Sequence, residues 1–156
     1  MDRQLLKFDD DAVDFNVGKL SKNEALIYLT KKLEIKNYVS DKYSQSIVNR
    51  EKDYPTGLQF SDITVAIPHG DASFVYQSSM AIGICRPPIR FHDMGDIENE
   101  VNVDMIVLLA INDSTHHIDI LNRLFNIFQN PVLAKELKAA TSAEIIVSII
   151  KDNLGE

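Results

Sequence analysis

Apolar residues recur at helical spacing in the first fifty residues of the chain. Leu26, Leu29 and Leu33 follow one another three or four positions apart, which is the spacing of one buried helix face. Just before them, Ser21 and Glu24 form a capping box, in which each residue satisfies a backbone N–H of the other. We therefore predict mainly helical structure in the first fifty residues.

A second helix is predicted to begin after Ser40. It places Tyr43 and Ile47 on one apolar face and carries Arg50 near its end. Pro55-Thr56-Gly57 then breaks the pattern, because proline and glycine both interrupt helices.

Strand patterns dominate the middle of the chain. Residues 63–67 are short and β-branched, residues 79–85 form a second candidate that Pro87-Pro88 ends, and residues 89–91 form a short third. Residues 101–111 alternate between apolar and polar at first and then become continuously apolar. That pattern is typical of a central strand that is covered on both faces.

Helical patterns return in the last forty residues. One of residues 113–115 can cap a helix whose apolar stripe reaches Phe128, and Asn130-Pro131 combines a cap with proline in the first turn. Thr141 to Glu144 has the spacing of another capping box. Helices on both sides of a strand-rich centre predict a single α/β domain with a covered sheet.

Composition narrows the class of protein further. The chain has 156 residues, enough for one domain, and a net charge of -7 with a pI near 5.0. Proteins that follow nucleic-acid phosphates, or that adhere to anionic membranes, carry the opposite charge. Cys85 is the only cysteine, which excludes an internal disulfide and favours a reducing compartment.

The sequence carries no membrane or export signal that we recognise. Residues 1–4 lack the basic and apolar pattern of a signal peptide, and the longest apolar run, residues 105–111, is too short to cross a bilayer. We expect a cytoplasmic protein without direct membrane insertion. The scattered glycines also match neither the dinucleotide-binding pattern nor the P-loop.

His69 is the first candidate for chemistry. It follows a predicted buried strand directly after Pro68 and before Gly70. Proline ends the strand and glycine adds no side chain beside the imidazole, so the ring could stand at a sheet edge, where functional groups of α/β proteins gather. From spacing alone, an ordinary surface or loop histidine remains the more common alternative.

His116 and His117 lie at the start of a predicted helix. Adjacent helical residues differ by about 100° in direction, so the two rings cannot face the same way. Free N–H groups at a helix start favour an anion and disfavour a protonated imidazole. A neutral histidine beside a bound anion is one interpretation, and two solvated side chains of the first turn is the other.

Other chemical sites find less support. The histidines have no zinc spacing and no Cys-x-x-Cys partner, so we expect no metal site and no cofactor. Cys85 lies in an apolar strand pattern and is interpreted as a small core residue, although Arg86 could lower its pKa. His92 is predicted in a solvated loop with Asp93.

Three stretches of the sequence resemble a known family. Residues 50–58 (Arg-Glu-Lys-Asp-Tyr-Pro-Thr-Gly-Leu) and 65–70 (Val-Ala-Ile-Pro-His-Gly) resemble the active-site region of fructose/mannitol-type enzyme IIA domains of the bacterial sugar phosphotransferase system. The Pro-Thr-Gly-Leu stretch and residues 91–95 (Phe-His-Asp-Met-Gly) look most like the galactitol branch. The resemblance covers about residues 15–152, and Gln59 departs from it because the family often has Gly or Ala there.

The resemblance implies a phosphoryl carrier with a mixed central sheet and helices on both faces. In such domains the histidine of the Pro-His motif, here His69, accepts a phosphoryl group from HPr on its distal nitrogen. It then donates the group to a cysteine of the IIB component, which serves the membrane component IIC. His117 matches a second family histidine that stabilises the phosphoryl group, with His116 as the fallback, and Arg50 matches the arginine that contacts its oxygens.

Two other functions remain open at this point. A regulatory, nitrogen-type IIA would share the Pro-His motif and act through interactions that depend on its phosphorylation. A binding domain with an inert His69 is the third hypothesis. The galactitol-like residues 54–58 favour transport.

Overall fold

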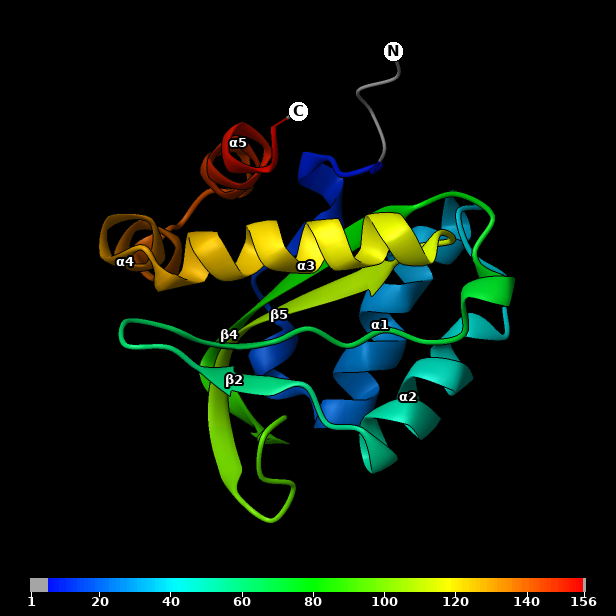
Figure 1. Cartoon of the computed structure of the whole chain (residues 1–156), viewed down its shortest axis with the longest axis horizontal. Coiled ribbons are helices and arrows are strands. Elements are labelled where there is room, and N and C mark those ends of the chain that lie inside the picture. Colours follow the sequence, from blue (N-terminus) through cyan, green and yellow to red (C-terminus); the bar gives the residue numbers. More distant parts are fainter. Residues whose placement is uncertain (1–5, 156) are drawn as a thin grey trace.

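A mixed five-stranded sheet forms the centre of the molecule (Figure 1). The computed structural model describes residues 6–155, so the prediction made on residues 1–4 lies outside the described residues. In spatial order the strands are β1 (Val13–Asp14), β4 (Ser79–His92), β5 (Glu100–Ala110), β3 (Thr64–Ala66) and β2 (Gly57–Gln59). The β1–β4 and β3–β5 pairs are parallel and the other two pairs are antiparallel.

Helices cover both faces of this sheet, as the sequence predicts. In Figure 1, α1 and α2 lie on one side of the sheet and α3 on the other, and α4 and α5 pack beside α3. The central position of β5 explains why Met105–Ala110 is continuously buried. The helices are α1 (Lys22–Ile35), α2 (Tyr43–Asp53), α3 (Ser114–Gln129), α4 (Pro131–Ala139) and α5 (Ala143–Leu154).

Side-chain caps fix where several helices begin. Ser21 and Glu24 form the predicted capping box at α1, with the Ser21 hydroxyl accepting from the Glu24 N–H at 3.2 Å. Asp113 caps α3, where its carboxylate accepts from the Thr115 N–H at 2.8 Å. Asn130 caps α4 just before Pro131. These caps confirm three predicted helix starts, and each is worth roughly 1 kcal/mol.

The predicted end of a strand at Pro87-Pro88 is wrong, because β4 continues to His92. Its pairing with β5 shifts between Ile84 and Ile89, whose partners Met105 and Val103 are only two residues apart. Both prolines fall inside this bulge, where the ladder needs no N–H donor. The two predicted strands are therefore one bulged strand, and His92 is its last residue rather than part of a loop.

Two predictions about helices also need correction. Ser142, not Thr141, caps α5 by accepting from the Ile145 N–H, so Glu144 stands one position too early for a capping box. The first fifty residues are also not wholly helical, because Val13–Asp14 adds β1 to the edge of the sheet. A strand of two residues is too short to leave a period in the sequence.

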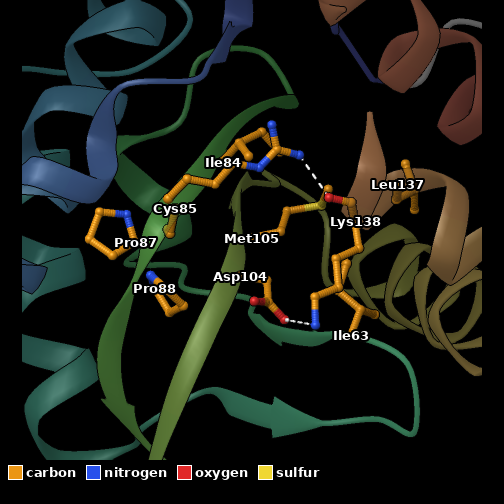
Figure 2. A pocket seen from close by; sticks show the side chains of 10 residues that line it. Ile63, Ile84, Cys85, Pro87, Pro88, Asp104, Met105, Leu137 and Lys138 are labelled. Atoms are coloured by element: carbon orange, nitrogen blue, oxygen red, sulfur yellow. Dashed lines mark hydrogen bonds and ion pairs between the residues drawn. The ribbon is translucent and has the colours of Figure 1, made fainter. Parts of the chain in front are cut away.

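The β4 bulge borders a cavity of about 220 Å³ between the sheet and α4 (Figure 2). Cys85 lies there, and burial raises the pKa of its thiol to about 12. The Arg86 guanidinium is directed to α4, where it donates to the Lys138 and Ala140 carbonyls at 2.7 Å each. Lys138 pairs with Asp104 at 3.8 Å. Arg86 therefore caps the end of α4 and does not activate the thiol.

Candidate active site

His69 lies where β3 ends, beside the end of the parallel strand β5. Pro68 is buried, and its carbonyl accepts from the Leu109 N–H of β5 at 2.9 Å. His69 itself is half-buried. The strand-end position predicted for His69 is therefore what the structure shows, and its backbone is tied to the most buried strand of the sheet.

The loop that carries His69 is held from the other side by α2. The Gly70 N–H donates to the Tyr43 hydroxyl at 3.0 Å, and that hydroxyl donates to the Leu109 carbonyl at 2.6 Å. The Asp71 N–H donates to the Ser46 hydroxyl at 3.2 Å. Sequence analysis assigned Tyr43 only to an apolar face and missed Ser46. A hydroxyl on a buried helix face was the one available signal, since buried hydroxyls need partners.

Gly70 is required by the approach of the loop to α2. A Cβ at this position would overlap the Ser46 hydroxyl and lie 3.1 Å from the backbone nitrogen of Ile47. From the sequence, Gly70 was expected only to add no side chain beside the imidazole, but a side chain at this position would meet α2 instead. The glycine lets the loop reach its anchor in α2, and in doing so it sets the position of the neighbouring ring.

One hydrogen bond defines the tautomer of His69. Its Nδ1 lies 3.1 Å from the Ile67 carbonyl. A carbonyl oxygen can only accept, so Nδ1 carries the proton and Nε2 keeps its lone pair. The neutral ring is thus prepared as a nucleophile at its distal nitrogen.

His117 faces His69 from the first turn of α3. The two ring centroids are 4.6 Å apart with an interplanar angle of 69°. The neighbouring His116 is directed elsewhere, with Nδ1 3.5 Å from a carboxylate oxygen of Asp113. The structure therefore brings His117 to His69 and leaves His116 outside the pair, as expected for adjacent helical residues.

Burial keeps both imidazoles of the pair neutral. It lowers the pKa of His69 to about 4, and the nearby His117 and the Arg50 guanidinium add to this effect against the Ile67 hydrogen bond. Burial also lowers the pKa of His117, again with help from Arg50. Neither ring is expected to carry a proton on both nitrogens near pH 7, so both keep a lone pair.

Arg50 supplies a positive charge beside the histidine pair. It is exposed on α2, and its guanidinium carbon lies 5.3 Å from the centroid of the Tyr54 ring. Among residues 6–155, none of the ion pairs involves Arg50. With Gly70 and Asp71 it lines an open hollow beside the His69 loop. This guanidinium can therefore bind an anion at the site.

The other sequence candidates lie outside the pair. His92 is at the end of β4, with Nε2 3.9 Å from a Glu100 carboxylate oxygen. Within residues 6–155, no group of three or more histidine, cysteine or acidic side chains could hold a metal ion. In that same part of the chain, no helix has both the length and the apolar composition to cross a bilayer.

Solved structures similar to this chain include enzyme IIA domains. Enzyme IIAMTL of Escherichia coli, solved in complex with phosphorylated enzyme IIBMTL, superposes with a TM-score of 0.78 at 21% identity, covering 95% of this chain and 99% of that one. The nitrogen regulatory protein IIA-Ntr of Neisseria meningitidis gives 0.76 at 25% identity, covering 92% and 95%. The predicted mixed sheet with helices on both faces is therefore the fold of the mannitol-type IIA domains.

Sequence comparison identifies the family. Residues 7–153 match the phosphoenolpyruvate-dependent sugar phosphotransferase system EIIA 2 family, and the chain belongs to it. The galactitol-specific EIIA component of Escherichia coli (strain K12) is 28% identical over 122 residues, which are 78% of this chain and 80% of that protein. The chain is therefore a phosphotransferase component, and the predicted family is confirmed.

The packing of Gly70 against α2 leads to a first prediction. Gly70→Ala should lower the free energy of unfolding by about 1 to 3 kcal/mol, because the added methyl group has to displace Ser46 or the loop. Gly95→Ala is the matched control, since a Cβ there meets only a carboxylate oxygen of Asp93 at 3.7 Å. Urea unfolding of both variants measures the difference. Equal stability of the two would contradict this account of Gly70.

The lowered pKa of His69 leads to a second prediction. Between about pH 6.5 and 4 the unfolded chain binds a proton at this residue and the folded chain does not, so stability falls as the pH falls through this window. Allowing for the partial exposure of the ring, wild type should lose about 2 kcal/mol more than His69→Gln across it. Unfolding at both ends of the window measures this. His69→Gln keeps His117 and Glu51, so the titrations of these two groups cancel in the difference between wild type and variant. Parallel pH profiles of the two proteins would refute the prediction.

Proposed function

We propose that this protein carries a phosphoryl group on Nε2 of His69 between HPr and a IIB component. The observation that carries the proposal is the neutral His69 ring, whose Nδ1 donates to the Ile67 carbonyl and whose centroid lies 4.6 Å from that of His117. Family membership supplies the reaction class. The geometry supports His69 as the phosphorylated residue and Nε2 as the phosphorylated atom.

The proposed transfer has two steps, and in each of them one bond to phosphorus forms as another breaks. In the first, the Nε2 lone pair of His69 attacks phosphorus, an N–P bond forms, and the bond between phosphorus and HPr breaks, with its electron pair leaving on HPr. In the second, a cysteine thiolate of IIB attacks the same phosphorus, and the N–P bond returns its electron pair to Nε2. The proton stays on Nδ1 throughout, and Nδ1 keeps donating it to the Ile67 carbonyl.

Arg50 and His117 assist both steps without becoming phosphorylated. The guanidinium of Arg50 provides a permanent, planar charge for the phosphoryl oxygens. Neutral His117 has one N–H to donate to an oxygen as charge redistributes. The reaction then depends on positioning and electrostatics, as phosphoryl transfer does in general.

The proposed partners are phospho-HPr and a IIB component, with IIC reached only through IIB. The relative solved in complex with a phosphorylated IIB supports a IIB partner. The galactitol-specific relative and the galactitol-like residues 54–58 favour uptake of a sugar or polyol of that kind. We place this exchange in the cytoplasm.

Regulation is the second candidate function. The similarity to the nitrogen regulatory IIA of Neisseria meningitidis, at 25% identity, is the observation that favours it. The chemistry at His69 would be the same in both cases. A regulatory protein would accept the phosphoryl group from a phosphorylated donor but have no IIB cysteine as its physiological acceptor, so transfer to IIB separates the two functions.

A third prediction identifies the phosphorylated residue. Incubation with enzyme I, HPr and labelled phosphoenolpyruvate should place an acid-labile label on His69 alone. His69→Ala should take up no label, while His92→Ala and His116→Ala should be labelled like wild type. Peptide mapping by mass spectrometry measures this, and undiminished labelling of His69→Ala would remove His69 from the proposal.

A fourth prediction concerns the residues around the phosphoryl group. Arg50→Ala and His117→Ala should remain folded and acquire the label on His69, but each should slow transfer on the order of 100-fold. Rapid-quench measurement resolves transfer from phospho-HPr and onward transfer to IIB. His116→Ala is the matched control for His117→Ala and should keep wild-type rates. Wild-type rates in both half-reactions for His117→Ala would exclude that residue from the site.

A further inference from the structure

A buried carboxylate lies one step behind the His69 loop. Glu51 of α2 is only 3% exposed. One of its oxygens accepts from the Thr56 N–H at 2.7 Å and the other accepts from the Thr56 hydroxyl at 2.9 Å. Thr56, also 3% exposed, immediately precedes β2. The carboxylate therefore holds both polar hydrogens of a single residue.

This pairing requires a carboxylate. Thr56 presents two donors, and ionised Glu51 presents two acceptor oxygens to them. A glutamine has only one acceptor oxygen, so its amide group would face one of the two donors. Burial raises the pKa of Glu51 to about 7, against the opposing effect of the Thr56 hydrogen bonds and of Lys22 and Arg50. A buried carboxylate is a costly way to hold a turn, which suggests a further role.

The Thr56 hydroxyl passes this constraint to the His69 loop. Its oxygen accepts from the Ile67 N–H at 3.1 Å, while the Thr56 carbonyl lies 3.4 Å from the same nitrogen. Gly57 and Ala66 are the neighbouring pair of the β2–β3 ladder. The hydroxyl thus extends the ladder by one position, to the residue whose carbonyl holds His69 Nδ1.

We propose that Glu51 and Thr56 are positioning residues, which fix Ile67 so that its carbonyl holds His69 in the tautomer with a free Nε2. This inference rests on the proposed function of His69. Neither residue touches the phosphoryl group. Glu51 orients the Thr56 hydroxyl so that its lone pair faces Ile67, and Ile67 in turn orients the imidazole.

Thr56→Val and Thr56→Ser test the proposal. Valine has the shape of threonine, but its side chain neither donates to Glu51 nor accepts from Ile67, whereas serine keeps the hydroxyl. Thr56→Val should slow transfer from phospho-HPr by about 10- to 100-fold, the range that a misplaced reacting group costs. Thr56→Ser should stay within about twofold of wild type. Glu51→Gln should resemble Thr56→Val, because the glutamine amide cannot satisfy both donors.

A matched variant separates positioning from a general loss of stability. Thr30 is fully buried in α1, where its hydroxyl donates to the Leu26 carbonyl at 2.7 Å. Thr30→Val removes the same atoms from a similarly buried site that has no hydrogen bond to the His69 loop. It should leave the transfer rate unchanged even where it lowers stability as much as Thr56→Val.

The decisive measurement is the tautomer of the His69 imidazole, which can be observed without phosphate. In ¹⁵N NMR above pH 7, where Glu51 is ionised, wild type, Thr56→Ser and Thr30→Val should show a protonated Nδ1 and an unprotonated Nε2. Thr56→Val should show averaging of the two tautomers. If wild type has this tautomer but is never labelled at His69, the proposed function fails and the positioning still stands. An unchanged His69 spectrum and a wild-type rate in Thr56→Val would overturn the inference.

Discussion

The candidate site depends on the parallel pairing of β3 with β5. Val65 and Ala66 pair with Met105 and Ile106, so the carboxyl ends of both strands reach the same edge of the sheet. His69 follows one strand and the helix that carries His117 follows the other. Two histidines that are 48 positions apart in the sequence thereby come to 4.6 Å between ring centroids. Had the two strands been antiparallel, these connections would leave from opposite edges.

A position at the edge of the sheet would not by itself orient the His69 ring. Hydrogen bonds to hydroxyl groups further constrain the loop that carries it. Tyr43, Ser46 and Thr56 each bond a backbone group of residues 67–71. These bonds reach the loop from α2 and from the start of β2, while β5 holds it through Leu109. Such a loop loses little further freedom when a reactant arrives, because backbone groups of Ile67, Gly70 and Asp71 already have partners.

The parts of this arrangement that the sequence could predict are those with a local signature. The caps of α1 and α3, the central strand and the Pro-His motif each occupy a few consecutive residues. The hydroxyl bonds link residues 11 to 66 positions apart, so no periodicity or spacing reveals them. The bulge in β4 was also hidden, since its two prolines carry the ordinary signal for the end of a strand. Strands as short as β1 and β2 form because they pair with neighbouring strands.

The same physical effect has opposite consequences for the two kinds of nucleophile in this chain. Burial disfavours the charged form of any group. For Cys85 the charged form is the reactive thiolate, so a pKa near 12 makes it an inert core residue. For His69 the charged form is the unreactive imidazolium, so a pKa near 4 keeps the nucleophilic ring available. A half-buried strand end, enclosed enough to exclude a proton yet bordered by the exposed Arg50, therefore suits a histidine and not a cysteine.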